Sequence, residues 1–116
     1  MAKAQCINLE VIQKSTPSYE LVFTEDDVAL DITGWTIYFT VKQNMNDTDA
    51  NAVINKKITT HSDPTNGKTL ITLTNTETNL TGNYYYAVDY KDDEGNEDTL
   101  YYGRIRFQKS TRSTRN

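Results

Sequence analysis

Two segments of this chain place an apolar residue, a threonine and a glycine directly before a long run of alternating side chains. Ile32-Thr33-Gly34 precedes residues 35–42, and Leu80-Thr81-Gly82 precedes residues 83–90. Glycine gives the backbone the freedom for a sharp turn into each run. The two-residue period of each run is that of a half-buried β-strand. In the first run, one face collects Trp35, Ile37, Phe39 and Val41. We therefore predict that these residues, with Trp35 central, form part of a core between packed sheets.

Shorter segments with the same period occupy most of the remaining chain. Turn signals separate them, among them Pro17, Asn66-Gly67 and Gly95. The predicted strands are residues 4–13, 19–24, 35–43, 52–60, 68–74, 83–91 and 98–108, with a short edge at 28–30. About seven strands at this spacing predict an all-β fold, an antiparallel β-sandwich formed by residues 1–108.

Composition excludes several functional classes. The chain has 116 residues, a formal net charge of −4 and a single cysteine, Cys6. The acidic balance disfavours nucleic acid as a partner. One cysteine permits no intrachain disulfide, which favours a reducing cytoplasm as the place of synthesis. No apolar run is long enough to cross a membrane, and no export signal is visible.

No catalytic or metal-binding pattern stands out. His61 is the only histidine, and neither it nor Cys6 has a sequence partner for nucleophilic catalysis. The acidic turn at residues 92–98 lacks the ordered ligand spacing of a calcium loop, so a solvated hairpin tip is the preferred interpretation. We expect no enzymatic activity, no cofactor and no required metal.

The C-terminal end is basic on an otherwise acidic protein. Arg104 and Arg106 alternate with apolar residues and should point outward, and Arg112 and Arg115 follow in a polar tail at residues 109–116. Two interpretations stay open, ordinary surface charge and a docking patch for an acidic neighbour.

Residues 80–86 resemble the segment that enters strand F of immunoglobulin-like domains. The resemblance implies that Tyr84 is the corner tyrosine, whose hydroxyl bonds back to nearby backbone. It also implies that Tyr86 fills the place of the second cysteine by packing alone. The predicted sandwich is therefore immunoglobulin-like.

A wider pattern resembles the small N-terminal domain of tailed-phage baseplate upper proteins and related short prophage tail proteins. The residues that carry it include Asp31-Ile32-Thr33-Gly34-Trp35, Phe39-Thr40-Val41-Lys42, Asp47-Thr48-Asp49-Ala50, Leu80-Thr81-Gly82-Asn83-Tyr84-Tyr85-Tyr86 and Tyr102-Gly103-Arg104-Ile105-Arg106-Phe107. It covers about residues 5–108. Such domains anchor receptor-binding or fibre parts to a virion. In baseplate upper proteins a fibre-like segment usually follows, whereas here the sequence stops about eight residues after the last predicted strand.

The resemblance implies a virion structural protein, made in the host bacterial cytoplasm and working as an adaptor or decoration subunit of the baseplate, tail, neck or head. Its partners would be other virion structural proteins in an oligomeric or multi-subunit assembly. The predicted partner-binding residues are Arg104, Arg106, Arg112, Arg115, Tyr101 and Tyr102. An alternative stays open, a carbohydrate- or receptor-binding module that uses outward tyrosines as stacking faces. Its candidate residues are Tyr38, Tyr85, Tyr101 and Tyr102.

Overall fold

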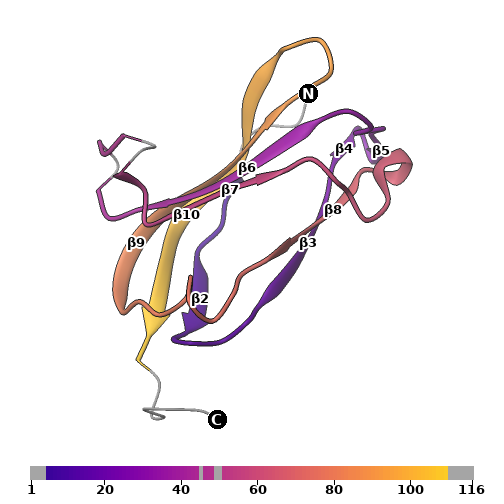
Figure 1. The fold of residues 1–116 in the computed structure, drawn as a ribbon. Helices are drawn as coiled ribbons and strands as arrows, with labels where there is room; N and C mark the ends of the chain where they lie inside the picture. The colour runs from indigo at the N-terminus through magenta and orange to yellow at the C-terminus, as the bar shows by residue number, and fades with distance from the viewer. Residues whose placement is uncertain (1–4, 45, 49–50, 110–116) are drawn as a thin grey trace.

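The computed structural model describes residues 5–44, 46–48 and 51–109, and strands make up most of them (Figure 1). A short 3₁₀ helix, η2 (Pro64–Asn66), precedes β8. The strands are β1 (Gln5–Cys6), β2 (Leu9–Ile12), β3 (Ser18–Val22), β4 (Thr24–Glu25), β5 (Val28–Ala29), β6 (Thr36–Lys42), β7 (Ile54–Ile58), β8 (Lys68–Thr72), β9 (Gly82–Lys91) and β10 (Glu97–Gln108).

The strands form two layers, as Figure 1 shows. One layer is a large sheet in the order β1-β10-β9-β6-β7, and β2 pairs with β10 further along that strand. The opposite layer is the two-stranded β3-β8 sheet, and β4-β5 is a small ribbon at the end of β3. The predicted all-β, sandwich-like fold is confirmed.

The N-terminal pairing differs from the prediction. The single strand expected at residues 4–13 is split into β1 and β2, and both run parallel to β10 instead of antiparallel. Only a hairpin forces two strands to pair antiparallel, and β2 and β10 lie near opposite ends of the chain, so either direction is possible for them. Between β1 and β2 the pairing is continued by other bonds: the Ile7 N–H donates to the Tyr102 carbonyl at 2.9 Å, and the Arg104 N–H donates to Asn8 Oδ1 at 3.1 Å.

The core lies where the alternation predicted it. Trp35, Ile37, Phe39 and Val41 are all buried between the layers, Trp35 with 8% of its surface exposed. Trp35 stacks on Tyr90 with ring centroids 4.8 Å apart, and Phe23 meets the Trp35 ring edge-on at 5.8 Å. Offset stacking and edge-on contacts are the favoured geometries for aromatic rings, so this cluster anchors one end of the core.

The returning tyrosine hydroxyl belongs to Tyr86, which corrects the role expected for Tyr84. The Tyr86 hydroxyl donates to the Ile7 carbonyl at 2.5 Å, and the residue is 5% exposed. Tyr84 is half-buried and meets Phe107 edge-on at 5.5 Å. The physical reason is position: Tyr86 lies opposite Gly103, where the missing side chain lets the Ile7 backbone approach.

Replacing Tyr86 with phenylalanine is expected to lower the free energy of unfolding by about 1 kcal/mol at neutral pH, because the hydrogen bond from the Tyr86 hydroxyl to the Ile7 carbonyl is lost. Burial, followed by the nearby Cys6, Tyr101 and Tyr19, raises the pKa of Tyr86 from 10.0 to about 12. A raised folded-state pKa gives stability that is present below pH 10 and is lost as the pH rises towards 12. The variant should therefore lose less stability than the wild type over that interval.

Urea unfolding from pH 7 to pH 12 measures both effects. Tyr84→Phe is the matched control, and it should change the neutral-pH midpoint less than Tyr86→Phe does. Equal midpoints for the two variants would contradict the assignment of the hydroxyl bond.

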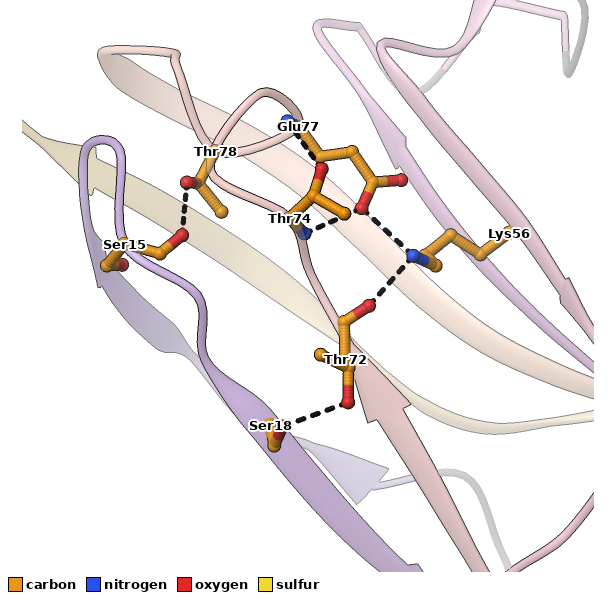
Figure 2. Close-up of polar contacts among 7 residues, drawn as sticks. All are labelled: Ser15, Ser18, Lys56, Thr72, Thr74, Glu77 and Thr78. Atoms are coloured by element: carbon orange, nitrogen blue, oxygen red, sulfur yellow. Dashed lines mark hydrogen bonds and ion pairs between the residues drawn. The ribbon is translucent and has the colours of Figure 1, made fainter. Parts of the chain in front are cut away.

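A polar cluster fastens β7 to the segment that follows β8 (Figure 2). The Lys56 ammonium donates to the Thr72 carbonyl at 2.8 Å and to Glu77 Oε1 at 2.9 Å. Glu77 Oε1 also accepts from the Thr74 N–H at 2.8 Å, and the Glu77 N–H donates to Thr74 Oγ1 at 3.1 Å. Lys56 lies on the inward phase of an edge strand, a placement that discourages further strand pairing there.

The same crossover is fastened to the β2–β3 turn. Thr78 is fully buried, and its hydroxyl donates to the Ser15 carbonyl at 2.6 Å (Figure 2). The Ser18 and Thr72 hydroxyls are 2.9 Å apart across β3 and β8. These bonds close the end of the sandwich opposite the β4-β5 ribbon.

Glu77→Gln is expected to lower the free energy of unfolding at pH 7 by about 1 kcal/mol, the size of a partly exposed, charge-assisted hydrogen bond. Burial acts to raise the pKa of Glu77, but the Thr74 N–H and the Lys56 ammonium outweigh it and hold the pKa below 4.5. The folded-state pKa is depressed, so this stability is present above pH 4.5 and is lost as the pH falls through the folded-state value.

The measurement is the urea midpoint at pH 7 and pH 3. The wild type should lose more stability on acidification than the Glu77→Gln variant. Glu10→Gln, which alters the exposed pair with Arg106, is the control. It should change the free energy of unfolding at pH 7 by less than about 0.5 kcal/mol. An identical acid response in wild type and Glu77→Gln would refute the assignment.

Candidate functional site

The outward face of the large sheet brings together side chains that are distant in sequence. Two neighbouring rows cross β6, β9 and β10. The strand register aligns Lys42, Tyr85 and Arg104 in one row and Thr40, Ala87 and Tyr102 in the next. Opposed side chains in such rows have Cβ atoms about 4.5–5.5 Å apart, so each row is a set of direct neighbours.

These two rows form a groove of about 460 Å³. Thr40 and Ala87 have short side chains and line it between longer neighbours, including Tyr85 and Tyr102. Thr40 is only 8% exposed although it lies on the outward face, because the longer side chains shade it. We call this hollow the outer-face groove.

The outer-face groove changes charge along the strands. Lys42 and Arg104 lie at one end, and Asp89 lies two residues beyond Ala87 at the other. Asp89 Oδ1 accepts from the Thr99 hydroxyl at 2.5 Å. A second, more polar hollow of about 640 Å³ shares Thr40 and Asp89 with the groove and also includes Tyr38, Asn55, Glu97 and Asp98. The groove therefore has a basic end and an acidic end.

The predicted partner-binding residues are only partly brought together. Tyr102 and Arg104 line the outer-face groove. Arg106 is the next outward residue on β10, and its guanidinium lies 3.8 Å from the Glu10 carboxylate in a well-exposed pair. Arg112 and Arg115 lie outside the described residues.

Tyr101 is a correction, because it faces the core and not the solvent. The β9–β10 register shifts between Thr99 and Tyr101, so Tyr101 comes opposite the buried Val88. The extra residue, Leu100, is itself buried. Without this bulge Tyr101 would have pointed outward, and no sequence signal marks the bulge.

Four residues of the groove were not predicted as site residues: Lys42, Thr40, Ala87 and Asp89. Their alternation with buried residues does mark them as outward. Their convergence, however, depends on the pairing register of three strands, which a single strand's pattern does not fix.

His61 has a structural position. Its Nε2 lies 2.8 Å from the Trp35 carbonyl and its Nδ1 lies 2.9 Å from the hydroxyl of the buried Thr69. A carbonyl oxygen only accepts, so Nε2 carries a proton, and in the neutral imidazole Nδ1 accepts from the Thr69 hydroxyl. The imidazole thereby links the start of β6 to β8 across the two layers. Cys6 is exposed and lies at the margin of the outer-face groove.

The acidic turn is organised around Asp92. Its carboxylate accepts from the N–H groups of Glu94 at 2.9 Å and Asn96 at 2.8 Å, and from the Asn96 side chain at 3.2 Å. Across residues 5–44, 46–48 and 51–109, no three His, Cys, Asp or Glu side chains gather as a metal site would require. The same residues contain no helix that is long and apolar enough to span a bilayer.

Comparison with known proteins adds evidence on the fold. No family model matches the sequence. No curated protein matches it either. Among solved structures, the N-terminal domain of phage TP901-1 ORF48 has a similar fold, with a TM-score of 0.58 and 8% sequence identity. The match covers 90% of this chain and 98% of that domain, so at this low identity the two share a whole-domain fold.

Proposed function

We propose that this chain is a non-enzymatic structural protein of a bacteriophage particle, an adaptor or decoration subunit of the baseplate, tail, neck or head. The observation that carries the proposal is the fold shared with the N-terminal domain of phage TP901-1 ORF48 over nearly all of both chains. The resemblance of the sequence of residues 5–108 to phage baseplate proteins supports the same function.

The architecture suits a structural subunit that binds neighbouring subunits through its surface. Buried side chains from both layers form the core, and the outer faces and the strand edges are the larger surfaces open to a partner. Among the described strands of the two layers, one edge is unpaired in each of β1, β2, β3, β7 and β8. A specific protein interface buries more than about 1,000 Å² in total. The outward face of the large sheet, with Tyr102, Arg104 and Arg106, is the broad surface available for such contacts.

The direct test is particle composition. The phage or induced prophage that encodes the chain is purified by density gradient, and its proteins are quantified by mass spectrometry. The chain should sediment with the particles at a fixed copy number relative to the other virion proteins. A chain found only in the lysate supernatant would overturn the proposal.

Deleting residues 109–116 is expected to abolish incorporation into particles while leaving the melting temperature of the free domain unchanged. The physical reason is that Arg112 and Arg115 would form bidentate hydrogen bonds to carboxylates of a neighbouring subunit. The measurement is complementation of a gene-deleted phage, scored by particle composition, beside thermal melting of the purified variant. Arg112→Gln with Arg115→Gln in the full chain tests charge separately from length. Normal incorporation without residues 109–116 would move the interface onto the sandwich itself.

A further inference from the structure

We propose that the outer-face groove binds an anionic saccharide, a sugar ring that carries a carboxylate or a phosphate. This goes beyond a structural role, because it assigns a small-ligand site to one part of the outward face of the large sheet. Three features carry the proposal. Two tyrosine rings take no part in core packing, a cation lies beside them, and the three strands beneath them are paired on both sides.

Two of the tyrosines that line the groove, Tyr85 and Tyr102, lie outside the buried core. Within the described residues, neither Tyr85 nor Tyr102 has a ring contact or a side-chain hydrogen bond, whereas Tyr86 and Tyr90 in the same sheet have ring contacts. Tyr102 is 43% exposed. A phenol ring whose face is open offers an apolar platform and a hydroxyl at its rim, which suits the mixed apolar and polar surface of a sugar ring.

The charge beside these rings is positive. Tyr85 lies between Lys42 and Arg104 in one cross-strand row, so a ring stacked on Tyr85 has both cations at its margin. Among the described residues no carboxylate pairs with the Arg104 guanidinium, in contrast to Arg106, which lies beside Glu10. A planar guanidinium recognises carboxylate or phosphate through two parallel hydrogen bonds. An anionic substituent therefore complements this end of the groove.

The strand pairing favours a ring-shaped ligand over an extended peptide. Extended peptides usually add to an unpaired strand edge through main-chain hydrogen bonds. The groove lies mainly over β6, β9 and β10, and each of these strands is paired on both sides, whereas the edge strand β1 contributes Cys6 at the margin. The floor of the groove therefore presents side chains. The volume of about 460 Å³ is that of a small-molecule site and accommodates one or two sugar rings.

A glycan array provides the first experiment. The full chain is labelled and applied to an array with uronic-acid, sialic-acid, phosphate-bearing and neutral members, and the best binder and its neutral counterpart are titrated by calorimetry. A polyglutamate peptide is titrated in parallel as an anion without a sugar ring. The anionic glycan should bind at least about tenfold more tightly than its neutral counterpart, the difference that one charge-assisted hydrogen-bond pair provides.

Two variants separate the components of the site. Arg104→Gln should abolish the preference for the anionic glycan, and Tyr85→Ala should weaken the anionic and neutral glycans alike by about tenfold, as expected for loss of a stacking face. Arg106→Gln, the next outward arginine of the same strand, is the matched control and should leave affinity within about twofold, because its exposed pair with Glu10 lies outside the groove. Thermal melting confirms that each variant is folded.

Three outcomes would overturn the proposal: no binding by any array member, binding that Arg104→Gln and Arg106→Gln weaken equally, or polyglutamate binding as tightly as the best glycan. The last result would instead identify a docking site for an acidic protein segment. The particle-composition test is independent, because a chain that fails to bind glycans can still be incorporated into virions.

Discussion

Trp35→Ala is expected to lower the free energy of unfolding by about 3–5 kcal/mol, the cost of deleting a large buried aromatic and leaving a cavity. Trp35 is stacked on Tyr90 and met edge-on by Phe23, so its removal exposes both remaining rings to an unfilled space. The Trp35 carbonyl also accepts from His61. If the backbone shifts to fill the cavity, this hydrogen bond is lost as well. Urea unfolding at pH 7 measures the loss.

Tyr38→Ala is the matched control for this change. Tyr38 lies three residues further along the same segment, on the outward face, and is half-buried. Its truncation removes an aromatic ring without opening a cavity in the core, so the loss should be much smaller than for Trp35. Equal losses for the two variants would show that the assignment of inward and outward faces on β6 is wrong.

Gly103→Ala is expected to lower the free energy of unfolding by about 3 kcal/mol or more, which is at the upper end of the losses that single substitutions usually cause. A Cβ at this position would lie 2.4 Å from the Ile7 carbonyl oxygen and 3.1 Å from Asn8 Oδ1. The backbone also has a φ of +153°, which L-residues rarely adopt. The β1–β2 segment would have to move away from β10, and the Tyr86–Ile7 hydrogen bond would be lost with it.

Gly82→Ala separates the two causes. Gly82 has a φ of +101°, but a Cβ there would meet nothing within 4 Å. Its substitution should therefore lower the free energy of unfolding only by the backbone strain, typically about 1–3 kcal/mol. Because Gly82 is exposed at the start of a strand, we expect the lower end of this range. Hydrogen exchange should show loss of protection in β1 and β2 for Gly103→Ala alone. Normal protection of these strands in that variant would mean that the close approach at Gly103 is not essential.

The strands and the core were predictable because one face of each long strand is buried. The alternation from Trp35 to Val41 identifies buried residues directly, and the Asp92–Asn96 turn follows from its glycine and acidic residues. The two Thr-Gly entries gave the starts of β6 and β9 to within one residue. Such features depend on local pattern, which a single sequence contains.

Features that depend on pairing between distant segments were not predictable. β2 runs parallel to β10, and nothing in residues 4–13 marks that direction. The inward position of Tyr101 results from a bulge at Leu100, and the hydroxyl bond made by Tyr86 depends on the backbone approach at Gly103. The outer-face groove likewise exists only once three strands are in register.

The parallel pairing of β2 with β10 has a mechanical consequence. Leu9 lies beside Ile105 and Ile12 beside Gln108, so the two strands advance in the same direction. When the chain is pulled from a residue before β2 and from a residue after β10, the force acts along the strands and slides them past each other. All hydrogen bonds between them then share the force and must rupture together, whereas a hairpin pulled at its two ends opens one bond at a time. Forced unfolding depends on the rate of this step, so the domain should withstand tension along its chain better than its modest core would indicate.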